Sequence, residues 1–236
     1  MLYISLDAST CPEKKGEFNY LEQVKMSHSN FHKDLNKEAI LGEYLDMVYP
    51  NIFRTSGYAV KRVTDLSLQY QGVDLLLFNK NKTFYVDEKA QLDYLNTALP
   101  TFAFELSYLK NNQYHKGWLF DSSKITNIYF LITCIHTNTG KCLSGGVKNV
   151  KITAIYRDRL IESLAELGLT EQRLLKLDKS IRASNKHGKH IITELHPKYQ
   201  GALYYSMTNK AEKPINLVLK LSFLSKLNTG SILLNS

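Results

Sequence analysis

The chain has 236 residues, of which 44% are apolar, so it can bury one sizeable core. Its longest apolar run, 128-IYFLITCI-135, has the length of a buried strand, which argues against a membrane-spanning helix. Its first residues lack the features of a signal peptide, and its three cysteines include no CxxC pair, which argues against a disulfide framework or a structural zinc site. These features predict a cytoplasmic protein that does not enter membranes.

The net charge of +8 is unevenly distributed. Residues 1–120 have 13 Lys or Arg against 14 Asp or Glu, whereas residues 121–236 have 17 against 8. All the excess positive charge therefore lies in the second half of the chain. A basic surface of this size favours a polyanionic partner such as nucleic acid, and an ordinary solvated surface is the alternative.

The first half predicts a helix followed by strands. Residues 1–30 are polar and irregular, with a short strand at 2–6. Apolar residues recur at helical spacing in 31–50, and Pro50 is expected to close this helix. Strand-like runs follow at 57–63, 72–78, 83–90 and 101–109. The polar turn 79-NKNK-82 joins the second and third runs into an antiparallel hairpin.

The second half predicts two strands, a helical pair and a late strand. The strands are 127–135 and 150–156, and the late strand is 215–224. The helices are 157–168, which ends at a glycine, and 170–183, which begins at a threonine N-cap. A basic loop, 185-NKHGKH-190, follows the helices. The pattern as a whole predicts a mixed α/β protein.

Charged residues interrupt the predicted hairpin. On the strand 84-FYVDEKAQ-91, alternation places Asp87, Lys89 and Gln91 on one face and Glu88 on the other. Asp74 stands before the apolar run of the partner strand, and the hairpin brings it towards residues 87–89. Two carboxylates, Asp74 and Asp87, together with the backbone carbonyl of Glu88, are the oxygen ligands that Mg²⁺ prefers. A nearby ammonium group can orient an activated water or stabilise charge on a phosphate.

These residues resemble the motif of the PD-(D/E)XK phosphodiesterase superfamily. That motif has an acid at the start of one strand, here Asp74, and (D/E)-x-K on the next, here 87-DEK-89. The superfamily often adds a glutamate on the preceding helix, which Glu43 would supply. Gly72-Val73 replaces the motif's proline, and Gln91 lies too close to Lys89 for the RecB-like subgroup.

The resemblance implies a restriction-endonuclease-like fold, a mixed β-sheet core flanked by helices. This core would span 31–156, follow the segment 1–30 and carry a basic α+β extension, 157–236, packed on it as one domain. It also implies an endonuclease that hydrolyses DNA phosphodiester bonds with Mg²⁺, for which Mn²⁺ would substitute. Asp74, Asp87, Lys89 and Glu43 would be catalytic, and water activated by the metal would attack the phosphate in line. RNA is the less favoured polymer, and a homodimer is consistent with relatives that cut both strands.

Further residues are candidates around this site. Gln91 and Glu105 would line it, although Glu105 could simply face solvent. The residues expected to bind DNA phosphates are Arg157, Arg159, Arg173, Lys176, Lys179, Arg182, Lys186 and Lys189. A restriction or nicking enzyme is favoured over a repair or junction nuclease. The alternatives are a non-catalytic DNA-binding scaffold of the same fold and a hydrolase of a small phosphorylated molecule.

Overall fold

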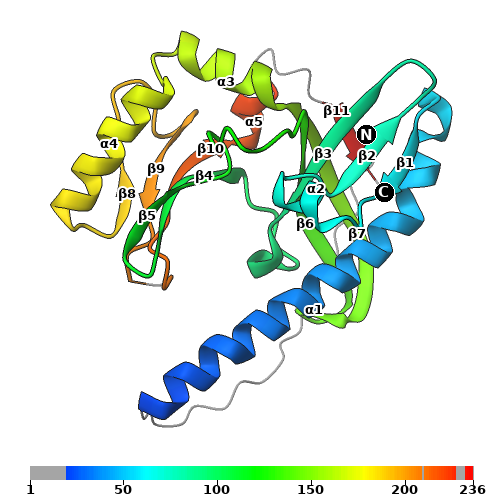
Figure 1. The fold of residues 1–236 in the computed structure, drawn as a ribbon, viewed down its shortest axis with the longest axis horizontal. Helices are drawn as coiled ribbons and strands as arrows, with labels where there is room; N and C mark the ends of the chain where they lie inside the picture. The colour runs from blue at the N-terminus through cyan, green and yellow to red at the C-terminus, as the bar shows by residue number, and fades with distance from the viewer. Residues whose placement is uncertain (1–19, 209, 227–231, 236) are drawn as a thin grey trace.

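The structure is a computed structural model that describes residues 20–208, 210–226 and 232–235. Within these residues the chain forms two β-sheets with helices packed against them (Figure 1). Sheet A has the strand order β1-β2-β3-β6-β7-β11, and sheet B has the order β5-β4-β10-β9-β8. The chain therefore has the mixed α/β class that the sequence predicts.

The elements have the following bounds. The strands of sheet A are β1 (Ala59–Arg62), β2 (Leu75–Phe78), β3 (Thr83–Ala90), β6 (Ile128–Thr139), β7 (Cys142–Tyr156) and β11 (Ile232–Asn235). The strands of sheet B are β4 (Thr101–Lys110), β5 (Gln113–Lys116), β8 (Gly188–His190), β9 (Gly201–Tyr205) and β10 (Ile215–Lys220). The α-helices are α1 (Tyr20–Phe53), α2 (Leu66–Tyr70), α3 (Arg157–Glu166), α4 (Glu171–Ser184) and α5 (Leu221–Leu224), and 3-10 turns span Arg54–Ser56 and Leu92–Tyr94. Sheet A is mixed because β3 and β6 are parallel, whereas its other pairs are antiparallel.

Helix α1 covers one face of sheet A. Its buried residues Leu45 and Tyr49 pack in one cluster with Phe130 and Ile132 of β6. The ring of Phe53 stacks on that of Phe130 at a centroid distance of 6.0 Å. The burial of these apolar side chains holds the helix to the sheet.

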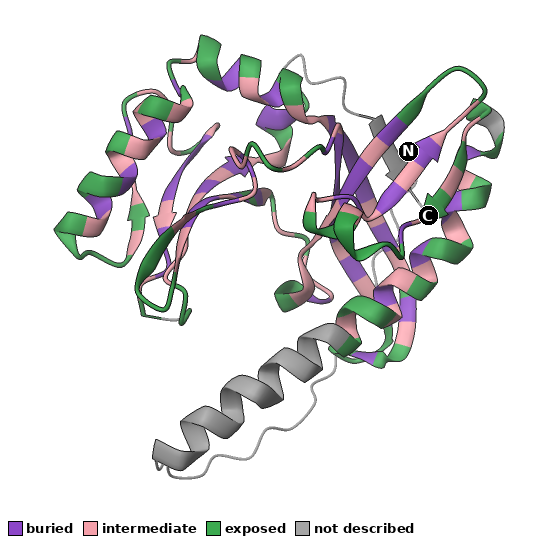
Figure 2. Cartoon of the chain, in the orientation of Figure 1, coloured by how far each residue is buried: buried purple, intermediate pink, exposed green. Residues whose placement is uncertain are grey.

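The other face of sheet A packs against sheet B. Tyr129 and Leu131, the alternate residues of β6, share a cluster with Phe104 and Leu217 of sheet B. Helices α3 and α4 add leucines to the same cluster. Figure 2 shows buried residues along the strands of both sheets. Because β6 is buried on both faces, its sequence is a continuous apolar run instead of an alternating one.

Several predicted elements differ from the structure. Helix α1 begins at Tyr20, within the segment expected to be irregular, and it continues past Pro50 to Phe53. A proline removes one hydrogen bond near the end of the helix, and packing of Phe53 on Phe130 offsets that loss. The late strand ends at Lys220, where α5 begins, and the basic loop contains β8. The strand expected at 2–6 lies outside the described residues.

The predicted hairpin and the second N-cap are confirmed. Strands β2 and β3 pair antiparallel, with Leu75 opposite Val86. The side chain of Thr170 accepts a hydrogen bond from the Arg173 amide at the start of α4. Both features depend on residues close in the sequence.

Sheet B joins the segment predicted to be the core with the segment predicted to be the basic extension. Strand β4, from the expected core segment 31–156, pairs with β10 from the expected extension 157–236. The two segments therefore share one sheet and one apolar cluster. In the part of the chain that is described, no helix has a stretch both long and apolar enough to cross a lipid bilayer.

Candidate active site

The hairpin places Asp74 beside the outgoing half of β3. Asp74 immediately precedes Leu75, which lies opposite Val86. The Asp74 amide donates to the Val86 carbonyl at 2.8 Å. Its carboxylate Oδ2 accepts a hydrogen bond from the Glu88 amide at 2.7 Å. Asp74 is therefore fixed against β3 through both its main chain and its side chain.

Asp87 and Lys89 project together from the opposite side of β3 to Glu88. Asp87 is buried, with 3% of its surface exposed. The Lys89 ammonium donates to Asp87 Oδ1 at 2.5 Å, and it lies 5.4 Å from the centre of the Trp118 ring. The Asp-Asp-Lys cluster, meaning Asp74, Asp87 and Lys89, thus combines two carboxylates with one ammonium group.

Burial and a neighbouring charge change the acidity of Asp87. Loss of solvent raises the pKa of its carboxyl group to about 7, from an ordinary value of 3.8. The Lys89 ammonium opposes this shift, and the Asp74 carboxylate adds to it. The two carboxylates are therefore close enough to repel each other, and one positive charge does not fully compensate them.

Glu88 faces the other side of sheet A, as strand alternation predicts. One of its oxygens accepts a hydrogen bond from the Tyr49 hydroxyl of α1, and the other accepts from Arg62 Nη1 at 2.6 Å. Arg62 also binds Asp46 of α1 at 2.8 Å. Burial raises the pKa of Glu88, and the Arg62 guanidinium opposes that shift. The Glu88 side chain therefore joins β3 to β1 and α1.

The backbone of Glu88 is oriented towards Asp74. In a strand, the N–H and C=O of one residue point to the same side. Because the Glu88 N–H binds Asp74, its carbonyl points to the same edge as the cluster. This orientation agrees with the role of backbone ligand expected for Glu88.

Gln91 and Glu105 lie near the cluster in different ways. The Gln91 side-chain amide donates to the Thr101 carbonyl at the start of β4, at 2.8 Å. Its Oε1 is buried and finds no hydrogen-bond partner among the described residues. Burial raises the pKa of Glu105, Glu212 adds to the shift, and Lys89 opposes it. Glu105 is thus within electrostatic range of the Lys89 ammonium.

Glu43 is not brought to the cluster. It is exposed on α1, and this helix packs on the face of sheet A that carries Glu88, opposite to Asp87. The helical spacing of apolar residues identifies the buried stripe of α1, but it does not say which face of the sheet the helix will cover.

Three of the eight residues expected to bind DNA phosphates are partly buried and make contacts within the protein, and the exposed Lys189 also donates to the Pro197 carbonyl at 3.1 Å. Arg157 donates to main-chain carbonyls in the loop between β5 and β6. Arg173 pairs with Glu194 at 2.5 Å, and Arg182 pairs with the buried Asp178 at 2.8 Å. The other five have exposed side chains: Arg159, Lys176, Lys179, Lys186 and Lys189.

No family profile, curated protein or solved structure matches this chain. The chemistry of the cluster must therefore be argued from its geometry.

The donor set of the cluster fits a small divalent cation with several waters. Among the described residues no group of three or more His, Cys, Asp or Glu side chains could hold a metal ion. Mg²⁺, however, needs only one or two carboxylates, because it keeps part of its water shell. The Asp74 and Asp87 side chains lie close enough to interact directly, and the repulsion between the two carboxylates favours a cation between them.

Trp118 packs against the core and also contacts the cluster through Lys89. The chain before it comes so close to β4 that a Cβ on Gly117 would lie 2.2 Å from the Glu105 carbonyl oxygen. The sequence 116-KGW-118 offers a signal for this contact, since a glycine next to a strand can mark a close backbone approach. Trp118 also contacts Phe104 and Tyr129, so it connects the cluster to the core between the sheets.

Replacing Gly117 by alanine is expected to lower the free energy of unfolding by about 1–3 kcal/mol, because the added methyl group has no room. The matched control is Gly42→Ala in α1, where the nearest atom to a new Cβ is 3.9 Å away. That change is expected to raise the free energy of unfolding by about 0.5–1 kcal/mol. Urea unfolding measures both. Equal effects of the two changes would contradict the close approach at Gly117.

Proposed function

We propose that this chain is a Mg²⁺-dependent endonuclease with a restriction-endonuclease-like core that hydrolyses DNA phosphodiester bonds. The observation that carries the proposal is the convergence of Asp74, Asp87 and Lys89 at the end of the β2–β3 hairpin. A carboxylate pair that has one buried member and that one ammonium does not neutralise has little use in stabilising the fold. It is well suited to holding a cation beside a phosphate.

Each residue of the cluster has a distinct role in this proposal. Asp74 and Asp87 would hold Mg²⁺, or Mn²⁺ in its place, with the backbone carbonyl of Glu88 beside them. When bound, the metal would polarise a phosphoryl oxygen and lower the pKa of an attacking water. Lys89 would donate hydrogen bonds to the phosphate as its negative charge grows, and Glu105 would help to orient the ammonium. Glu43 has no role, since it lies on the other side of the sheet.

The proposed substrate follows from the surface charge. Arg159 and the four extension lysines, meaning Lys176, Lys179, Lys186 and Lys189, are exposed on and after α3 and α4. Such residues neutralise phosphates without reading the base sequence. A site-specific restriction or nicking enzyme is the favoured subtype, in which two copies could act on the two strands.

Cleavage of plasmid DNA under titration of Mg²⁺ tests the proposal. The wild-type protein should nick or linearise the plasmid, and EDTA should abolish this activity. Lys89→Ala should reduce the rate by about 10²–10³-fold, because a preorganised donor to the reacting phosphate is lost. The matched control is Lys210→Ala, which removes a lysine from an exposed ion pair with Asp93. Its rate should equal that of the wild type.

Three results would contradict the assignment. Equal activity of the wild type and Lys89→Ala would reject the role of this lysine. DNA binding without cleavage by either protein would favour a non-catalytic scaffold. Specific hydrolysis of a small phosphorylated compound, without DNA binding at low salt, would instead favour the small-molecule hydrolase.

Replacing the four extension lysines by alanine together is expected to weaken duplex DNA binding and reduce its salt dependence. Each lost phosphate contact should lower the slope of log affinity against log salt by about 0.9. The control variant removes the same charge from exposed lysines elsewhere in the chain: Lys61, Lys80, Lys141 and Lys148. Fluorescence anisotropy at several salt concentrations measures both slopes. Similar slopes for the two variants would argue against a DNA surface on α4 and the following loop.

A further inference from the structure

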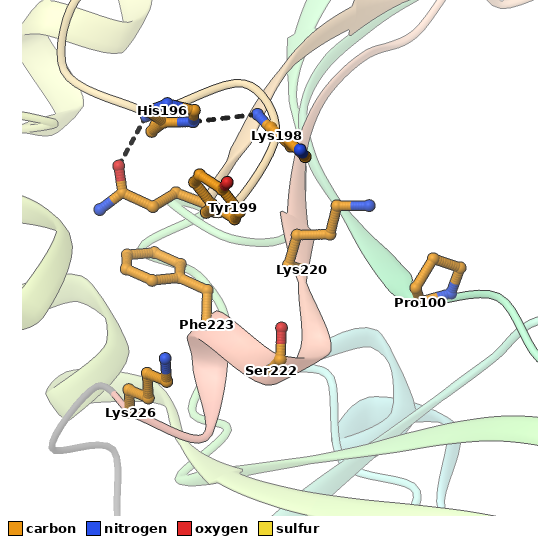
Figure 3. A pocket seen from close by; sticks show the side chains of 9 residues that line it. Pro100, His196, Lys198, Tyr199, Lys220, Ser222, Phe223 and Lys226 are labelled. Atoms are coloured by element: carbon orange, nitrogen blue, oxygen red, sulfur yellow. Dashed lines mark hydrogen bonds between the residues drawn. The ribbon is translucent and has the colours of Figure 1, made fainter.

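A second site lies at the edge of sheet B, away from the Asp-Asp-Lys cluster. A pocket of about 650 Å³ opens between the loop before β9 and the junction of β10 with α5 (Figure 3). This basic pocket is defined by six of its lining residues: His196, Lys198, Tyr199, Lys220, Phe223 and Lys226. Its volume is within the range of small-molecule sites, which is roughly 300–1,000 Å³.

The pocket carries uncompensated positive charge. Lys198, Lys220 and Lys226 all line it, and none of the described residues that line it is acidic. Among the described residues, no carboxylate forms an ion pair with any of these three lysines. Three ammonium groups around one hollow repel each other unless an anion lies between them. The charge therefore selects an anionic ligand.

The pocket also offers an aromatic surface. Tyr199 is 62% exposed, and Lys198 Nζ lies 5.4 Å from the centre of its ring. Figure 3 shows Tyr199 and Phe223 together on one side of the pocket, with Lys220 and Pro100 on the other. Aromatic faces next to lysines are the arrangement with which proteins bind successive bases and phosphates of a single strand.

Hydrogen bonds order the turn that carries Tyr199. The amides of Tyr199 and Gln200 both donate to the His196 carbonyl, at 3.2 and 2.8 Å. The His196 amide donates to the Gln200 side chain at 2.6 Å, and His196 Nδ1 accepts from the Lys198 amide at 3.2 Å. This closed turn orders the loop before any ligand binds, which reduces the entropy cost of binding.

The main chain connects the pocket to the cluster. Pro100 lines the pocket, and its carbonyl accepts a hydrogen bond from the Leu221 amide at 2.9 Å. The next residue, Thr101, accepts the hydrogen bond from Gln91, two residues after Lys89. The pocket and the cluster are therefore linked through Pro100, Thr101 and Gln91.

We propose that the basic pocket binds a nucleoside phosphate unit, with the base stacked on Tyr199 and the phosphate among Lys198, Lys220 and Lys226. The bound unit would belong to a single DNA strand, beside the bond that is cut. This inference therefore rests on the proposed function and adds a substrate contact to it. The same chemistry also fits a free mononucleotide, and the experiment distinguishes the two sources.

The test measures binding in EDTA, so that cleavage plays no part. The probe is a short fluorescein-labelled oligodeoxythymidylate, and thymidine 5′-monophosphate is the competitor. Tyr199→Ala should weaken oligonucleotide binding by about 10-fold, which is the effect of losing one stacked base. Lys198→Ala with Lys220→Ala should lower the salt slope by about 0.7 for each lost phosphate contact. The matched controls are Tyr114→Ala, an exposed tyrosine of β5, and Lys141→Ala with Lys148→Ala, two exposed lysines outside the proposed DNA surface.

The outcomes separate this inference from the proposed function. If thymidine 5′-monophosphate competes with the oligonucleotide and this competition depends on Tyr199, the pocket binds free nucleotides. If the mononucleotide does not compete, the pocket binds a unit of a DNA strand. Wild-type affinity of Tyr199→Ala for both probes would overturn the inference, even if the protein cleaves plasmid DNA. Binding that depends on Tyr199 in a protein that never cleaves DNA would support the pocket and reject the nuclease.

Discussion

Replacing Asp87 by asparagine is expected to abolish DNA cleavage and to make the metal-free protein more stable at neutral pH. The loss of activity follows from the removal of one of the two carboxylates proposed to hold Mg²⁺. Metal ions contribute several kcal/mol to the stabilisation of a reacting phosphate. The rate should therefore fall at least about 10³-fold. A plasmid cleavage assay measures this loss.

The gain in stability follows from the pKa of Asp87. In the folded protein its carboxyl group holds a proton up to about pH 7, whereas the unfolded chain releases it near pH 3.8. Between these values the folded state binds more protons, so the free energy of unfolding falls as the pH rises. The side-chain amide of the Asp87→Asn protein would have no proton to release. The variant should therefore match the wild type near pH 4 and exceed its stability above pH 7.

Thermal unfolding in EDTA at several pH values measures this difference. The control is Asp93→Asn, because Asp93 is exposed in its ion pair with Lys210. This variant should leave the dependence of stability on pH unchanged. Addition of Mg²⁺ should raise the Tm of the wild type but not that of Asp87→Asn, because only the intact site binds the ion. If Asp87→Asn were the less stable protein at pH 8 in EDTA, Asp87 would be a structural partner of Lys89.

Replacing Arg182 by alanine is expected to lower the free energy of unfolding by about 3–5 kcal/mol. Arg182 pairs with Asp178, which is 1% exposed, and its other nitrogens donate to the Lys213 carbonyl and to Ser107 of β4. Its guanidinium also lies 5.4 Å from the centre of the Tyr205 ring. Without this arginine, Asp178 would be a buried carboxylate with no counter-charge.

Urea unfolding compares this variant with two others. Lys179→Ala removes an exposed lysine from the same helix, and its effect should stay within about 0.5 kcal/mol of zero. The double change Arg182→Met with Asp178→Leu should recover most of the lost stability, because it replaces the ion pair by apolar groups. If Arg182→Ala were as stable as the wild type but bound DNA more weakly, Arg182 would be a contact to DNA phosphates and not a structural residue.

The parts of the site that the sequence predicts are those made by neighbouring residues. A four-residue turn fixes the β2–β3 hairpin, and strand alternation then sets the sides of Asp87, Glu88 and Lys89. Thr170 is predicted for the same reason, since an N-cap depends on the next three residues.

The parts that the sequence does not predict depend on contacts between distant segments. The position of Glu43 depends on which face of sheet A helix α1 covers. The roles of Arg157, Arg173 and Arg182 depend on partners more than a turn away or in another element, so composition alone cannot distinguish them from exposed lysines. The helix end at Phe53 depends on the ring of Phe130, far along the chain.

The pairing of β4 with β10 has a consequence for biosynthesis. Phe104 lies opposite Leu217, so sheet B cannot close until the ribosome has made the chain as far as Lys220. A nascent or proteolysed fragment that stops at residue 156 would contain Asp74, Asp87 and Lys89, but it would leave β4 without β10. Long-range pairing of this kind also slows folding. The contacts between the proposed catalytic site and sheet B should therefore form late, when the last strands of sheet B are in place.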